Sequence, residues 1–253
     1  MSTSAERREE LTSVYREARG CTRCPELART RKQVVFGAGN ADADLMFVGE
    51  APGAKEDELG VPFVGAAGKL LDELLAEVGL ARSDVFIANV LMCRPPGNRD
   101  PLPGEIDNCQ EYLMRKVDLI APKVICTLGN FATKLLRGEP VGISRLHGQA
   151  EIVTVGNRAV RLYPLYHPAA ALYTRSLLDT LRADVARLPA LLAMHPPPQP
   201  EPVSEPVPAV PEPELAEEPE PAVSKPELAG EPETPAWALR ADDEPEDRQL
   251  GLF

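Results

Sequence analysis

Short runs of consecutive apolar residues alternate with longer amphipathic stretches over the first 195 residues of the chain. Continuous apolar runs of this length are typical of strands that are buried on both faces of a sheet. Three such runs predict strands at 44–49, 85–91 and 123–128. Two later β-like runs predict further strands at 150–155 and 160–165.

Helical spacing of the apolar positions predicts helices around and between these strands. The expected helices cover residues 5–19, 67–78, 105–120, 130–136 and 174–194. Strands that alternate with helices indicate an α/β fold, here a three-layer α/β/α sandwich around a central, mostly parallel sheet. Ligands bind such sheets at the carboxyl ends of the strands, so the residues directly after each strand are the first candidates for a functional site.

Charge is divided unevenly between this region and the C-terminal end of the chain. The whole sequence contains 27 basic and 39 acidic residues, a net charge of −12. The last 58 residues, 196–253, contain 15 acidic and 3 basic residues together with 15 of the 27 prolines. Residues 1–195 are therefore neutral, and the acidity of the chain does not argue against nucleic-acid binding by that region. We expect a folded domain over 1–195 and a disordered, acidic, proline-rich linker over 196–248.

Four of the five cysteines have a spacing typical of ligands. Cys21 and Cys24 form a C-x-x-C pair, and Cys93 and Cys109 follow at longer intervals. Because the sequence shows neither a secretory signal nor an apolar stretch long enough for a membrane span, we expect a cytoplasmic protein with reduced thiols. The spacing alone leaves structural zinc and an iron–sulfur cluster open. Cys126, inside an apolar run, is expected to pack as a small hydrophobe.

Three polar residues stand at the ends of predicted strands. Glu50 lies in the glycine-rich turn GEAPG, and Asn89 lies near the end of the second apolar run. His167 stands in the segment Tyr166-His167-Pro168 that follows the last predicted strand. Each could serve structure alone, as a turn residue, a loop cap or a packed histidine. A fixed amide can also read a donor–acceptor edge, and a rigidly held imidazole can donate a hydrogen bond to a developing anion.

Together these features resemble the family 4 uracil-DNA glycosylases, which carry a four-iron, four-sulfur (4Fe–4S) cluster. The resemblance covers nearly all of residues 21–192 and rests on the cysteine quartet and three segments. The segments are GEAPGAKEDELGVPFVGAAGKLLD from Gly49, NVLMCRPPGNRDP from Asn89 and YHPAAALY from Tyr166. The resemblance implies that the ligands of a structural 4Fe–4S cluster are Cys21, Cys24, Cys93 and Cys109.

The same resemblance implies an activity and a set of site residues. The expected enzyme is a monomer that flips uracil out of DNA and hydrolyses its N-glycosidic bond, which starts base excision repair. Phe63 resembles the aromatic residue that stacks on uracil, Asn89 the amide that reads the N3–H and O4 edge, and His167 the catalytic histidine. The carboxylate side of the pocket is implied to consist of Gly49, Glu50 and Ala51. The alternative is a zinc- or cluster-stabilised DNA-binding protein of the same superfamily without uracil excision.

One position departs from the pattern of the best-known uracil glycosylases. They carry an aspartate where this chain has Ala51, so Glu50 is the candidate for the second catalytic residue. A related branch has GEQPG in this turn and a basic KRRIH loop whose histidine bonds covalently to DNA. This chain has GEAPG and no such loop. We therefore expect catalytic turnover rather than covalent trapping on DNA.

Basic residues near the strand ends are candidates for DNA-backbone contacts. They are Arg94, Arg99, Arg145 and Arg175, with Lys134 and Arg137 as further candidates. The last five residues, QLGLF, resemble the pentapeptide by which bacterial repair and replication proteins bind the sliding clamp. The implied contact residues are Gln249, Leu250, Leu252 and Phe253. We therefore expect a cytoplasmic, nucleoid-associated protein with the clamp as a second partner.

Overall fold

A mixed sheet forms the centre of the chain in a computed structural model that describes residues 3–200. Within these residues six strands pair in the order β1-β3-β2-β4-β6-β5. They are β1 (Ala38–Gly39), β2 (Leu45–Gly49), β3 (Phe86–Asn89), β4 (Val124–Leu128), β5 (Glu151–Val155) and β6 (Arg158–Leu165). The four inner strands are parallel, and β1 and β5 pair antiparallel at the two edges. The predicted mostly parallel sheet is confirmed.

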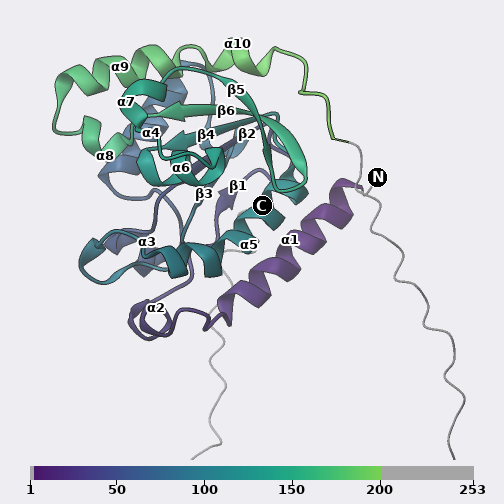
Figure 1. Cartoon of the computed structure of the whole chain (residues 1–253), viewed down its shortest axis with the longest axis vertical. Helices are drawn as coiled ribbons and strands as arrows, with labels where there is room; N and C mark the ends of the chain where they lie inside the picture. Colours follow the sequence, from purple (N-terminus) through teal and green to yellow (C-terminus); the bar gives the residue numbers. More distant parts are fainter. Residues whose placement is uncertain (1–2, 201–253) are drawn as a thin grey trace, which may run out of the picture. The chain divides into compact units, whose positions relative to one another are not determined.

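Helices precede β1, connect β2 to β3, β3 to β4 and β4 to β5, and follow β6 (Figure 1). The N-terminal half contains α1 (Ser4–Arg19), α2 (Pro25–Thr30), α3 (Ala54–Leu59), α4 (Ala66–Glu77) and two 3₁₀ turns, η1 (Arg82–Asp84) and η2 (Pro96–Asn98). The C-terminal half contains α5 (Pro103–Ile120), α6 (Asn130–Arg137), α7 (Ile143–Leu146), α8 (Pro168–Ala171), α9 (Arg175–Val185) and α10 (Leu188–Leu192). None of the described helices is both long and apolar enough to cross a membrane.

Two hydrophobic cores lie on opposite faces of the sheet. Along β2, Met46 and Val48 pack into the core that contains residues of α1 and α5, whereas Leu45 and Phe47 pack into the core formed with α4, α9 and α10. This alternation follows from the two-residue period of a strand. Figure 1 shows α1 and α5 side by side, and α9 and α10 across the opposite side of the sheet. The structure thus confirms the three-layer α/β/α sandwich.

Two predicted elements differ from those observed. The expected helix over 174–194 is divided into α9 and α10, and Pro189 lies in the first turn of α10. Proline fits a first turn but removes a hydrogen bond from a helix interior, which explains why one helix does not continue through it. The expected strand over 85–91 ends at Asn89, and Val90 and Leu91 instead donate to the carbonyls of Gly49 and Glu50 (both 2.9 Å).

Contacts of the described region continue past the domain boundary expected at residue 195. Arg161 donates to the carbonyl of His195, and Gln199 donates to the carbonyl of Ala159 at 3.0 Å. The boundary itself remains a prediction. Residues 201–253, with most of the expected linker and the QLGLF peptide, lie outside the described residues.

Candidate active site at the carboxyl ends of the strands

A cavity of about 350 Å³ opens where the parallel strands end. Its walls include Glu50 and Ala51 after β2, Asn89 at the end of β3, and His167 after β6. Phe63, from the loop between α3 and α4, forms another wall. The fold therefore brings together five of the six pocket residues expected from the sequence. The sixth, Gly49, does not line the cavity but packs against Asn89 and Phe63.

Asn89, which lines this cavity, has an unsatisfied hydrogen-bond acceptor. Its side chain is only 2% exposed, and its Oδ1 has no hydrogen-bond partner among the described residues. A buried acceptor without a partner costs about 1–3 kcal/mol, so such atoms are rare in folded proteins. The position is suited to a ligand that brings its own N–H group.

Gly49 allows Asn89 and Phe63 to approach the end of β2. A Cβ at this position would lie 2.4 Å from Asn89 Oδ1 and 2.7 Å from the Phe63 ring. Both distances are too short for a Cβ, so a side chain at this position would displace Asn89 or Phe63. The Phe63 ring is 6% exposed and stacks near the His167 ring, with 5.6 Å between centroids and 30° between planes.

The backbone of Phe63 is strained in a way typical of functional sites. Its φ of +53° lies in the left-handed region, which costs a non-glycine residue on the order of 1–3 kcal/mol. The following turn is held by Glu56 of α3, whose Oε1 accepts from the backbone N–H groups of Val64 (2.9 Å) and Gly65 (2.8 Å). Glu56 also lines the cavity. The sequence did not single it out, since it is one of four charged residues in the stretch KEDE.

His167 is held as a neutral imidazole. It caps α8, and its Nδ1 accepts from the backbone N–H of Ala169 at 3.1 Å. Burial lowers the pKa of His167 to about 4, so the ring is uncharged at neutral pH. With Nδ1 as the acceptor, the single ring proton resides on Nε2. His167 therefore contributes a neutral N–H donor to the residues that line the cavity.

Glu50, which also lines the cavity, is the carboxylate candidate. The group is half-buried, and burial raises its pKa, with a further contribution from the negative charge of Asp100. A carboxylate with a raised pKa at the mouth of a cavity is a common feature of acid–base sites.

The four candidate cysteine ligands converge beneath the neighbouring loops. Cys21, Cys24, Cys93 and Cys109 line one small cavity on the side of α1 and α5, and all are free thiols. Burial raises the pKa of Cys93 to about 11 against the opposing effect of Arg31, which donates to its Sγ at 3.3 Å. Thiols of this kind ionise when a metal replaces the proton.

The four thiols supply a donor set that suits either structural zinc or an iron–sulfur cluster. In the described part of the chain, no three His, Cys, Asp or Glu side chains are already placed around a single metal position.

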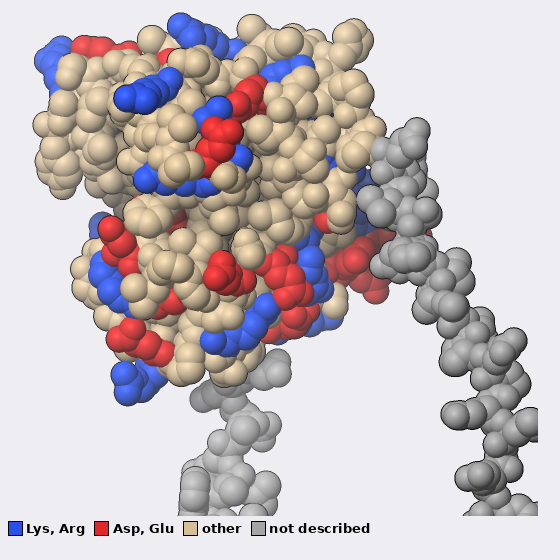
Figure 2. All heavy atoms as spheres, in the orientation of Figure 1, with Lys and Arg blue, Asp and Glu red and all other residues tan. Residues whose placement is uncertain are grey.

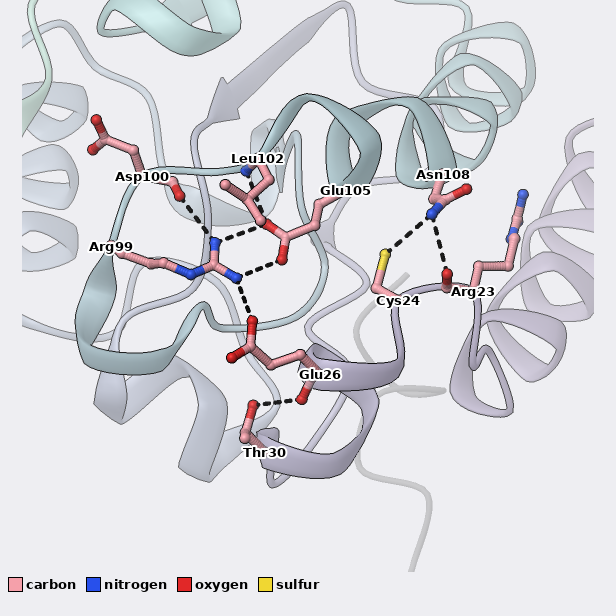
Figure 3. A network of polar contacts seen from close by, with 9 residues as sticks. All are labelled: Arg23, Cys24, Glu26, Thr30, Arg99, Asp100, Leu102, Glu105 and Asn108. Atoms are coloured by element: carbon pink, nitrogen blue, oxygen red, sulfur yellow. Dashed lines mark hydrogen bonds and ion pairs between the residues drawn. The ribbon is translucent and has the colours of Figure 1, made fainter.

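A network of polar contacts braces this cavity (Figure 3). Arg99 connects Glu26 of α2, at 2.8 Å, with Glu105 of α5, at 2.6 Å. Asn108 of α5 donates to the carbonyl of Arg23 at 3.1 Å and to the sulfur of Cys24 at 3.7 Å. Cys126, in contrast, is buried within β4, as expected for a packed residue.

The basic residues proposed to contact DNA fall into two groups. Arg99 and Arg137 form ion pairs within the protein, and Arg94 donates to Asn98 Oδ1 at 2.8 Å. The exposed members that form no ion pair with the rest of residues 3–200 are Lys134, Arg145 and Arg175. Figure 2 shows basic and acidic side chains intermixed over one face of the molecule, in keeping with a neutral domain.

Two exposed apolar residues follow the catalytic candidate on the same segment. Leu172 is 41% exposed and Tyr173 is 90% exposed, immediately after α8. Large apolar side chains at such exposure next to a pocket are informative because they have no role in the core. In the sequence alone, Tyr173 is not distinguishable from a buried apolar neighbour such as Ala171.

Comparison with known proteins agrees with this geometry. A model of the uracil DNA glycosylase superfamily matches residues 36–190. The type-4 uracil-DNA glycosylase of Archaeoglobus fulgidus is 45% identical over 184 residues, which cover 71% of this chain and 92% of that protein. The type-4 enzyme of Sulfurisphaera tokodaii is 44% identical over 183 residues (70% of this chain, 83% of that protein). That of Saccharolobus solfataricus is 41% identical over 191 residues (74% and 88%). The resemblance is thereby confirmed, and the chain belongs to the uracil DNA glycosylase superfamily and, within it, to the type-4 uracil-DNA glycosylases.

Proposed function

We propose that this chain is a uracil-DNA glycosylase that hydrolyses the bond between uracil and deoxyribose in DNA and so initiates base excision repair. The observation that carries the proposal is the buried, unpartnered Oδ1 of Asn89 in a cavity that also contains a neutral histidine and an aromatic ring. The type-4 relatives are named for this activity. The alternative of a DNA-binding protein without excision leaves these three groups without a use.

Recognition of uracil follows from the two ends of the Asn89 amide. Oδ1 accepts the uracil N3–H, and the amide nitrogen donates to O4. Cytosine presents the opposite pattern, an acceptor at N3 and a donor at C4, so both contacts become repulsive. Sites built on such hydrogen bonds discriminate by factors on the order of 10⁴–10⁵, because a mismatched ligand leaves buried polar groups unpaired. Phe63 adds stacking on the base, worth roughly 1–3 kcal/mol.

Bond cleavage places negative charge on uracil and positive charge on the sugar. His167 donates its Nε2–H to uracil O2, where the anion forms, and it does so as a neutral group already oriented by its bond to Ala169. Glu50 stabilises the cationic sugar and positions the attacking water. Ala51 has no polar side chain for either task. No covalent bond to the enzyme forms, and uracil leaves as the free base.

The target base reaches the cavity only after leaving the duplex, which costs a few kcal/mol. Tyr173 and Leu172, exposed beside the segment that carries His167, are suited to fill the gap left in the base stack. Exposed Arg145, Arg175 and Lys134 contact phosphates around the flipped nucleotide.

Cys21, Cys24, Cys93 and Cys109 would hold a 4Fe–4S cluster. When bound, the cluster supplies a structural cross-link between the segment before α2, the loop after β3, and α5. A zinc protein would be colourless, whereas a 4Fe–4S protein is brown, so a visible spectrum of the purified chain distinguishes the two.

The substrate is genomic DNA, so we place the protein in the cytoplasm at the nucleoid. Clamp binding by Gln249, Leu250, Leu252 and Phe253 and the monomeric state remain predictions.

Replacement of His167 by alanine tests the proposal. The variant should lose most uracil release from a labelled single-stranded oligonucleotide while it keeps the wild-type melting temperature at neutral pH. His195→Ala is the matched control, because His195 is exposed and does not line the cavity. Equal activity of the His167 variant and the control would exclude this mechanism.

A further inference from the structure

The loop between α3 and α4 that carries Phe63 is fastened from outside the cavity as well as from inside. On the inner side Glu56 accepts from Val64 and Gly65. On the outer side Arg82, in the turn η1 that precedes β3, donates to the carbonyl of Phe63 at 2.9 Å and to that of Pro62. The two residues thus hold consecutive peptide groups of the loop.

The arrangement around the Phe63 carbonyl leaves little freedom to this residue. A Cβ at Gly68 of α4 would lie 1.7 Å from the Phe63 oxygen, so the carbonyl packs directly on bare helix backbone. Arg82 donates to the same oxygen and is itself held by Asp72 of α4 at 3.0 Å. The left-handed conformation of Phe63 is therefore maintained by a helix surface and a guanidinium group.

We propose that Arg82 is a positioning residue for uracil: it holds the carbonyls of Pro62 and Phe63 and thereby keeps the Phe63 ring in the stacking position beside His167. The inference rests on the proposed function of the cavity. Arg82 does not line the cavity, so its influence on uracil passes through Phe63 alone. Loss of its donors removes a restraint on a strained backbone, and the ring then leaves the stacking position.

This role predicts a specific kinetic signature. Stacking acts on the bound base before and during bond cleavage alike, so its loss raises KM more than it lowers kcat. We expect Arg82→Met, which keeps an unbranched side chain but removes the donors, to raise KM for uracil-containing DNA about tenfold. Inhibition by free uracil should weaken by about the same factor. Arg82→Lys, which keeps one charged donor group, should restore part of the loss.

A double-mutant cycle with Phe63→Ala separates positioning from general stability. If Arg82 acts through the ring, Arg82→Met adds no further loss in the Phe63→Ala background. If Arg82 only stabilises the fold, the two losses multiply, and the proposal is overturned.

Arg182→Met provides the matched control. Arg182 of α9 pairs at 3.1 Å with Glu77 of α4, the helix that also carries Asp72. Among the described residues, Arg182 forms no hydrogen bond or ion pair with the Phe63 loop. Its loss should leave KM and uracil inhibition unchanged. A tenfold rise in KM in this variant would show that any weakening of α4 suffices, and would also overturn the proposal. Absence of uracil release by the wild-type protein would instead refute the proposed function, so the two failures are distinguishable.

Discussion

Replacing Asn89 by alanine should separate activity from stability. Asn89 Oδ1 has no hydrogen-bond partner among the described residues, and a buried acceptor in that state costs about 1–3 kcal/mol. Alanine removes this penalty and leaves a small void of opposing effect, so we expect a melting temperature within about 3 °C of wild type. On this reasoning, the amide serves its ligand and adds little to the stability of the free chain.

The expected loss of activity is large. The variant forfeits two hydrogen bonds to uracil, each worth about 1 kcal/mol, and leaves the uracil N3–H and O4 buried without partners. Together these effects amount to about 3–4 kcal/mol, or roughly a 100- to 1,000-fold fall in kcat/KM. Single-turnover release of uracil from a labelled oligonucleotide, followed by alkaline cleavage at the abasic site, measures this loss.

Two results would refute this reasoning. A loss of activity below about fivefold would show that the amide does not read the base. A fall in melting temperature of more than about 8 °C would show that Asn89 is mainly structural.

Further predictions concern pH, the cluster, the duplex and the tail. Because the pKa of His167 is lowered to about 4, the unfolded chain binds more protons than the native one between pH 6.5 and 4. The stability that depends on the neutral His167 ring is therefore fully present above pH 6.5, and on the order of 2 kcal/mol of it is lost at pH 5. His167→Ala should lack this loss of stability between pH 6.5 and pH 5 when unfolding is followed in urea titrations. Cys109→Ser should abolish the visible absorption of the purified protein, whereas Cys126→Ser should retain it; absorption retained in the first variant would remove Cys109 from the ligand set. Tyr173→Ala should slow excision from double-stranded DNA about tenfold and from single-stranded DNA much less, and equal effects on the two substrates would argue against a wedge. Deletion of residues 249–253 should abolish capture by the purified sliding clamp and leave uracil excision unchanged, while unaltered capture would contradict the predicted peptide.

Much of this fold can be predicted from the sequence because its sheet is buried on both faces. The apolar run ending at Gly49 could only be a short strand or part of a buried helix, and its length and flanking turn favour a strand. Once the strands are parallel, topology alone brings Glu50, Asn89 and His167 to one edge. Phe63 was different, since its place in the site was implied by family resemblance.

Other features depend on contacts that no local pattern contains. The break between α9 and α10 follows from Pro189, but the apolar spacing on both sides still reads as one helix. Glu56 and Arg82 are ordinary charged residues in the sequence and acquire their roles only when the loop folds between them. The state of Asn89 Oδ1 is a property of the assembled cavity, because a missing partner can be recognised only when all neighbours are in place.

The most direct test of the whole account is release of free base by the purified wild-type chain from two single-stranded oligonucleotides that differ at one position, uracil in one and cytosine in the other. The cavity predicts that uracil is released at a rate proportional to enzyme, leaving an abasic site, and that cytosine release is lower by a factor on the order of 10⁴. No uracil release by a folded, brown protein, or similar release of both bases, would contradict it.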